Sequence, residues 1–217
     1  MDFPFRAGPA TSAAGVDLPL GRHTGVLEME TFAQPKNLVH DPRFMRDREQ
    51  ITATLSLDVI DTPIRDVISA FNALPHCYTL QSCYGHFLHA AQRDPHSLLN
   101  LPANDIGTVE YRIAYIALCI EKSEAGRRLI AWLRQVTEID PAYVQFGSPD
   151  WFWSQHLNSY AIQVEPERFK DKDVAILEYE EALYVQEVRG LFFERLREVP
   201  KALNCGAEGR ILGEHCK

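Results

Sequence analysis

The segment from Asp61 to Phe87 constrains the fold more than any other, because it reads as a helix, a short turn, a strand and a polar turn in succession. Asp61 stands before Thr62 and Pro63, which is typical of a helix start. Apolar residues then recur at helical spacing, at Ile64, Val67, Ile68 and Phe71. A turn at Asn72–Pro75 and a strand at Tyr78–Ser82 follow.

The same mixture of patterns continues along the chain. Further helices are predicted over Asp41–Leu57, Ser123–Thr137 and Lys172–Val199, with a short helical turn at His96–Asn100. Further strands are predicted over Thr108–Ile120, which is long for one unbroken strand, and over Tyr143–Phe146 and Ser159–Glu165. The sequence therefore predicts an α/β or α+β fold with a single mixed sheet and helices packed against it.

The two ends of the chain differ from this body. Prolines and glycines interrupt every pattern in residues 1–40, which predicts an extended N-terminal arm. Residues 41–200 form the predicted single α/β domain. Residues 201–217 have few large apolar side chains, which predicts a flexible C-terminal tail.

The composition is that of an ordinary globular protein, with 46% hydrophobic and 24% charged residues. A formal net charge of -8 disfavours a general affinity for nucleic acid, which needs clustered Lys and Arg. No apolar run approaches the roughly 20 residues that span a bilayer. The five cysteines lack C-x-x-C spacing, which indicates reduced thiols and a cytoplasmic protein.

Reactive side chains gather where the strand at Tyr78–Ser82 ends. Cys83 is a candidate nucleophile beside His86, whose imidazolium would favour the thiolate; the alternative is an inert buried thiol. Together with His89, and with His76 as a further donor, these residues also suit zinc or iron, whereas the simpler interpretation is a hydrogen-bonded polar turn. Gly85 permits either an unusual backbone or a close approach to a ligand, and Ser82 either binds a ligand or caps the turn.

Two further sets of residues are candidates for ligand binding. Trp151 and Trp153 would form a stacking wall for a planar ligand, or would close over the core in a short helix, or would make a dimer contact. Glu110 and Arg112 share one face of a strand. They would bind a polar substrate if that face lines a cleft, and form an exposed ion pair otherwise.

The segment around Cys83 resembles a block of the tRNA wybutosine-synthesis methyltransferase family. In that family an acidic residue and a helix lead to an Asn-containing turn and to a strand that ends in Ser-Ser-Cys-Ser-Gly-Arg. The matching residues here are Asp61, Ile64–Phe71, Asn72–Pro75, Thr79 and Gln81-Ser82-Cys83-Tyr84-Gly85-His86. The resemblance extends over about Arg43–Val136. Gln81, Tyr84 and His86 depart from the motif, and His86 replaces a permanent cation by a group that titrates or binds metal.

Three interpretations of function follow. The resemblance implies a small-ligand enzyme that uses S-adenosylmethionine, with tRNA as a substrate that the net charge disfavours. A second interpretation is a Cys/His metal-binding or sensing protein without turnover. A third is a dimeric structural module, assembled through the aromatic segment and the N-terminal arm.

Overall fold

The computed structural model describes residues 34–170 and 172–208, which all belong to one compact unit. Most of the predicted arm, and the predicted tail beyond residue 208, therefore lie outside the described residues. Residues 34–40 form neither helix nor strand. They are held against the body through backbone groups, since the Lys36 N–H donates to Ser148 Oγ at 3.0 Å and the Val39 N–H to Asn158 Oδ1 at 2.8 Å.

The helices of the described residues comprise five α-helices and four short 3-10 turns. The α-helices are α1 (Phe44–Thr54), α2 (Arg65–Ala73), α3 (Glu124–Val136), α4 (Asp150–Gln155) and α5 (Tyr179–Glu208). Short 3-10 turns occur at Leu57–Val59, Thr62–Ile64, Thr137–Ile139 and Glu167–Phe169. Ser123 caps α3 as predicted, because its Oγ accepts from the Gly126 N–H at 3.1 Å.

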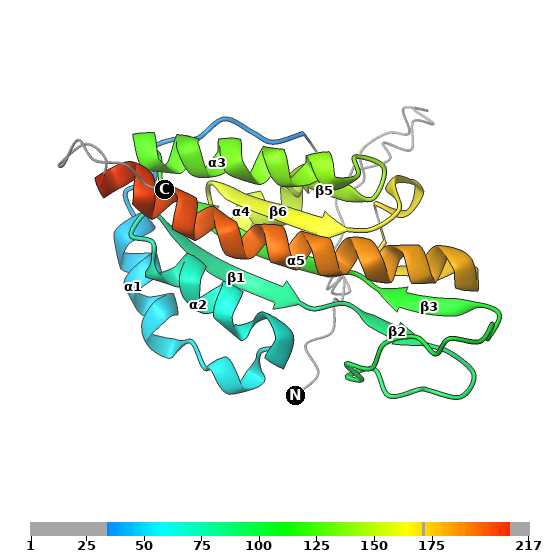
Figure 1. The fold of residues 1–217 in the computed structure, drawn as a ribbon. Helices are drawn as coiled ribbons and strands as arrows, with labels where there is room; N and C mark the ends of the chain where they lie inside the picture. The colour runs from blue at the N-terminus through cyan, green and yellow to red at the C-terminus, as the bar shows by residue number, and fades with distance from the viewer. Residues whose placement is uncertain (1–33, 171, 209–217) are drawn as a thin grey trace, which may run out of the picture. The chain divides into compact units, whose positions relative to one another are not determined.

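The strands form two antiparallel sheets in place of the single mixed sheet that we expected. The first has the order β1-β4-β6-β5, and the second the order β2-β3-β7. Their bounds are β1 (Cys77–Cys83), β2 (His86–Leu88), β3 (Val109–Arg112), β4 (Ala114–Ile120), β5 (Val144–Gly147), β6 (Ser159–Val164) and β7 (Val174–Leu177). In the chain, β1 is followed by β2 and β3 by β4, while β1 pairs with β4 and β2 pairs with β3. The two sheets therefore meet at the short breaks between β1 and β2 and between β3 and β4 (Figure 1).

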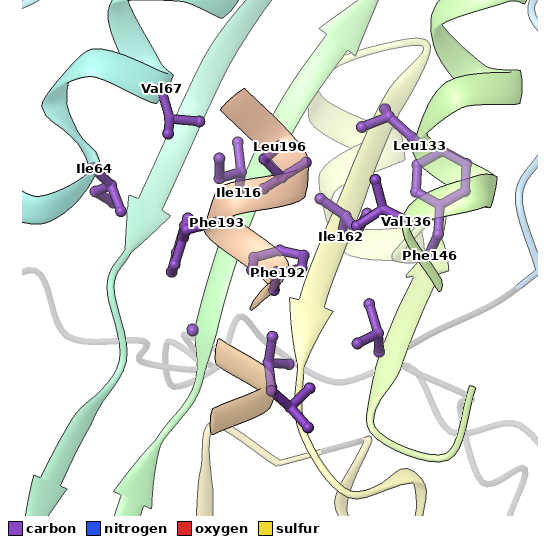
Figure 2. Close-up of a cluster of buried hydrophobic side chains, with 14 of the residues drawn as sticks. Ile64, Val67, Ile116, Leu133, Val136, Phe146, Ile162, Phe192, Phe193 and Leu196 are labelled. Atoms are coloured by element: carbon purple, nitrogen blue, oxygen red, sulfur yellow. The ribbon is translucent and has the colours of Figure 1, made fainter. Parts of the chain in front are cut away.

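The main core lies between the four-stranded sheet and helices α2, α5 and α3, which run across one face of it (Figure 1). Figure 2 shows Leu196 and Phe192 of α5 near Ile116 of β4 and Ile162 of β6, whereas Phe193 lies on the side of β1. All of these side chains are buried. A smaller cluster of Phe44, Tyr78 and Cys119 lies under α1. The predicted α/β class is therefore confirmed, with the helices packed on the sheet.

Three local predictions need correction. Residues Val174–Leu177 form strand β7, paired with β3, although the pattern from Lys172 predicted helix; cross-strand pairing overrides the local pattern there. The helix that follows continues beyond Val199 to Glu208, into the predicted tail. His96–Asn100 is a non-helical loop. The long strand predicted at Thr108–Ile120 is broken at Ile113, in agreement with its unusual length.

Among the described residues, no helix combines the length and the apolar character that crossing a membrane requires.

Candidate metal centre

An irregularity in β1 decides which way Cys83 points. The pairing with β4 shifts between Thr79 and Gln81, so that Cys83 lies opposite Tyr115 while Ser82 lies opposite Ile116. Directly paired residues share a face of the sheet, and Ile116 belongs to the main core. Ser82 is therefore on the helix-covered face and Cys83 on the other. The shift reverses the alternation that an unbroken strand would give, and such irregularities are frequent beside functional sites.

A tight glycine turn links Cys83 to His86 at the junction of the two sheets. Gly85 has φ +90°, a conformation that other residues rarely adopt. A Cβ atom there would lie 2.9 Å from Ala114 Cβ and 3.1 Å from the Tyr111 hydroxyl. The unusual backbone predicted for Gly85 is thus present, and the close approach here is to Ala114 and Tyr111. The Gly85 N–H points back to Cys83 Sγ at 3.4 Å.

Asp61 joins Cys83 and His86 from the start of the segment that leads into α2. Its side chain does not cap the 3-10 turn at Thr62–Ile64 that precedes α2. Its Oδ2 instead accepts from the Tyr84 N–H at 2.8 Å and lies 3.4 Å from His86 Nε2. One donor atom from each of Asp61, Cys83 and His86 lies within 4.8 Å of the other two. A carboxylate, a thiol and an imidazole therefore converge on one point.

The electrostatics of the cluster favour an ionised pair formed by His86 and Asp61. Burial alone would lower the pKa of His86, but hydrogen bonds with Asp61 and Cys83 outweigh it and raise the pKa to about 10. Burial would likewise raise the pKa of the Asp61 carboxyl, but hydrogen bonds from His86 and the Tyr84 N–H hold it below the usual value. His86 is thus an imidazolium at neutral pH, beside a carboxylate.

A backbone carbonyl fixes the orientation of the His86 ring. His86 Nδ1 lies 3.1 Å from the Ser97 carbonyl oxygen, which only accepts, so Nδ1 carries a proton. Nε2 is left to face Asp61. In a neutral ring its lone pair would meet the lone pairs of the carboxylate. That arrangement is stable only when Nε2 is protonated or when a cation lies between the two groups.

The same orientation distinguishes this cluster from a nucleophilic triad. In a triad the nucleophile and the carboxylate bind opposite nitrogens of the histidine ring. Here the Ser97 carbonyl occupies Nδ1, and Asp61 lies on the Nε2 side. Metal-ligating histidines commonly donate their second N–H to a carbonyl in this way, which fixes the tautomer and the ring. The three donor atoms of Asp61, Cys83 and His86 are therefore close enough together to contact a single ion.

The structure does not bring the other histidines predicted as ligands to this point. β2 is an extended strand, so its side chains alternate and His89 follows on the face opposite His86. The prediction of a His86–His89 metal pair was based on a helical turn or a polar loop. Among the described residues, the group of three donors contains Asp61 and does not contain His89. His76 precedes β1 and lies about 20 Å from Cys83 along that strand.

The aromatic segment lies apart from the cluster, whereas the charged pair lies beside it, since Arg112 of β3 is paired directly with His86 of β2. Trp151 and Trp153 belong to α4, and Trp153 packs edge-on against Tyr160 of β6. Strand β4 lies between β1 and β6. Across it, Tyr160 is aligned with Thr79 of β1, whereas the β6 residue aligned with Cys83 is Gln163. Glu110 and Arg112 form a partly exposed ion pair, with Arg112 Nε 3.6 Å from Glu110 Oε1, which agrees with the simpler of the two interpretations.

Comparison with known proteins adds little to this geometry. No family model and no curated protein matches the chain. Two structures of the PH1069 protein from Pyrococcus horikoshii are similar, at 12% and 11% identity and TM-scores of 0.39 and 0.41. They cover 77% and 78% of this chain and 97% and 95% of theirs. A hypothetical protein from Aeropyrum pernix is 11% identical over 65% of this chain and 98% of its own, with a TM-score of 0.37. Similarity at this level identifies neither a function nor a site.

Proposed function

We propose that the protein binds a divalent transition metal, with zinc as the best fit, through Asp61, Cys83 and His86. The observation that carries the proposal is the convergence of these three donor atoms within 4.8 Å. Thiolate, imidazole and carboxylate are all ligands of zinc, and a mixed set of one sulfur, one nitrogen and one oxygen suits zinc better than magnesium or calcium.

The number of ligands supports a catalytic use of the metal. Structural zinc sites are closed by four protein ligands, whereas catalytic sites have three and leave one position for water or substrate. Among the described residues the cluster contains three. An ion held there would act as a Lewis acid on a small ligand. The chain's own contribution is to hold the ligands: Ser97 orients His86, and the Tyr84 and Gly85 N–H groups donate to Asp61 and Cys83.

Metal analysis of protein purified without an affinity tag tests this proposal. We expect about one zinc per chain in the wild type and a loss of zinc in Cys83→Ala and Asp61→Ala. His89→Ala and Cys119→Ala are matched controls, because they remove a neighbouring imidazole and a buried thiol that lie outside the cluster. Equal metal content in Cys83→Ala and Cys119→Ala would contradict the proposal.

A second candidate function is the small-ligand enzyme that the wybutosine-synthesis methyltransferase resemblance implies, with Cys83 as a reactive thiolate and His86 as its partner. It is favoured by the raised pKa of His86 and by the Gly85 N–H that donates to Cys83 Sγ. S-adenosylmethionine is the cofactor to test, by calorimetry with the metal-free protein. Binding that is lost in Cys83→Ala and in His86→Ala would favour this candidate. The expected iron, tRNA and homodimer stay predictions.

A further inference from the structure

Helix α5 inserts a buried arginine behind the turn that carries the proposed ligands. The side chain of Arg189 is among the largest that are fully enclosed, with an exposed fraction of 2% for the residue. Its Nη1 donates to the Gly85 carbonyl oxygen at 2.7 Å, and its Nη2 to Asn100 Oδ1 at 3.2 Å. The guanidinium also lies over the rings of Tyr84 and Phe87, at 4.1 Å and 4.9 Å from their centroids.

These contacts involve the chain neighbours of two of the proposed ligands, Cys83 and His86. Tyr84 follows Cys83 in the chain, Phe87 follows His86, and the Gly85 carbonyl belongs to the peptide that joins Gly85 to His86. The Gly85 N–H, on the preceding peptide, donates to Cys83 Sγ. Arg189 therefore holds the short piece of backbone whose conformation sets the separation of the sulfur from the imidazole.

A contribution to folding stability does not explain why an arginine is buried at position 189. Removing a guanidinium from water is costly unless an anion compensates it. Among the described residues no carboxylate forms an ion pair with Arg189, and its Nε atom has no hydrogen-bond partner. In compensation, the guanidinium gains a carbonyl, an amide, two ring faces and electrostatic interactions with Tyr84, Tyr111 and Cys83. A hydrophobic side chain of the same length would fill the same space between α5 and the turn without that cost.

We propose that Arg189 is a positioning residue of the metal centre. It fixes the Gly85 peptide so that Cys83 Sγ and the His86 imidazole are already at the spacing that one ion requires. This inference rests on the proposed zinc site. It assigns to α5 a role in the site that is separate from its packing, and it connects residues 104 positions apart in the chain.

The test compares zinc affinity and stability in full-length Arg189→Met and Arg48→Met. Arg48 is a matched control, because its guanidinium also binds backbone carbonyls, those of Asn72, Leu74 and Cys77, but at the opposite end of β1. Affinity is measured by competition with a chromophoric chelator, and stability by urea unfolding of the metal-free protein.

We expect Arg189→Met to weaken zinc binding about 10–100-fold, as loss of an outer-shell partner typically does. Arg48→Met should lower the urea midpoint and leave zinc affinity within about twofold of the wild type, since distant sites are nearly additive. The cobalt-substituted Arg189→Met protein should also show an altered visible spectrum, which a purely structural role would not produce.

The outcomes separate this inference from the metal centre itself. Zinc affinity in Arg189→Met within twofold of the wild type, together with loss of zinc in Cys83→Ser, would overturn the positioning role and leave the centre standing. A wild type that binds no zinc would overturn both. If the Met variant does not fold, Arg189→Lys replaces it, because lysine keeps the charge but lacks the planar fork that reaches both Gly85 and Asn100. Unchanged affinity in that variant would overturn the inference.

Discussion

Replacing Gly85 by alanine should destabilise the protein through two separable effects. The first is backbone strain, since φ is +90° at this position, and such conformations cost a non-glycine residue about 1–3 kcal/mol. The second is steric. The new methyl group would lie 2.9 Å from Ala114 Cβ and 3.2 Å from the Ala114 backbone nitrogen, and overpacking of this kind costs about 1–3 kcal/mol. The expected loss is therefore about 2–6 kcal/mol.

Gly107 offers a control that isolates the second effect. It also has a positive φ, of +71°, but a Cβ atom there would meet nothing within 4 Å. Gly107→Ala should therefore lose only the strain energy, about 1–3 kcal/mol. Urea unfolding measures the unfolding free energy of both metal-free variants. We expect Gly85→Ala to lose about 1–3 kcal/mol more than Gly107→Ala. Zinc affinity should fall in Gly85→Ala alone. Equal losses of stability would refute the close approach at the turn.

Three further predictions concern the thiols, the pH dependence and the core. In metal-free protein Cys83 should be alkylated faster than Cys119, because burial raises the pKa of Cys119 to about 12, and zinc should protect Cys83; mass spectrometry that finds Cys119 modified first would contradict this. His86 has a raised pKa of about 10, so the stability that its charge contributes is complete below its ordinary value of 6.5 and is lost as the pH rises through 10. The unfolding free energy of metal-free protein should decline over that range, and a slope unchanged in His86→Gln would count against the ion pair. Leu133→Ala, in the buried face of α3, should cost about 2–5 kcal/mol without changing zinc content, and a loss below about 1 kcal/mol would show that this face is not core.

Sequence patterns predicted the elements whose signals are local. The Ser123 cap, the stripe of Val67, Ile68 and Phe71 on α2, and the strand before Cys83 all correspond to elements of the structure. β7 was missed because Val174–Leu177 is defined by its pairing with β3 and lies next to the helical pattern of α5. The division into two sheets also depends on pairing between distant strands, which periodicity does not reveal.

The sequence identified most residues of the candidate site, and the structure changed which of them lie together. The sequence placed Cys83, Gly85 and His86 together, and the structure agrees. Asp61 was singled out only as the acidic residue of the wybutosine-synthesis resemblance and as a helix start. That it turns to His86 depends on how α2 packs beside β1. His89 was chosen because it is close in sequence, and the alternation of strand β2 removes it from the cluster. Arg189 was not among the predicted site residues, because its contact with Gly85 joins helix α5 to a distant turn.

X-ray absorption at the zinc edge of the protein loaded with one equivalent of zinc tests the central claim most directly. The proposed centre predicts one sulfur ligand at about 2.3 Å and nitrogen or oxygen ligands at about 2.0–2.2 Å. The sulfur shell should be absent in Cys83→Ser and present in Cys77→Ala. A zinc shell made only of nitrogen and oxygen in the wild type, or a sulfur shell that persists in Cys83→Ser, would contradict a metal centre built from Asp61, Cys83 and His86.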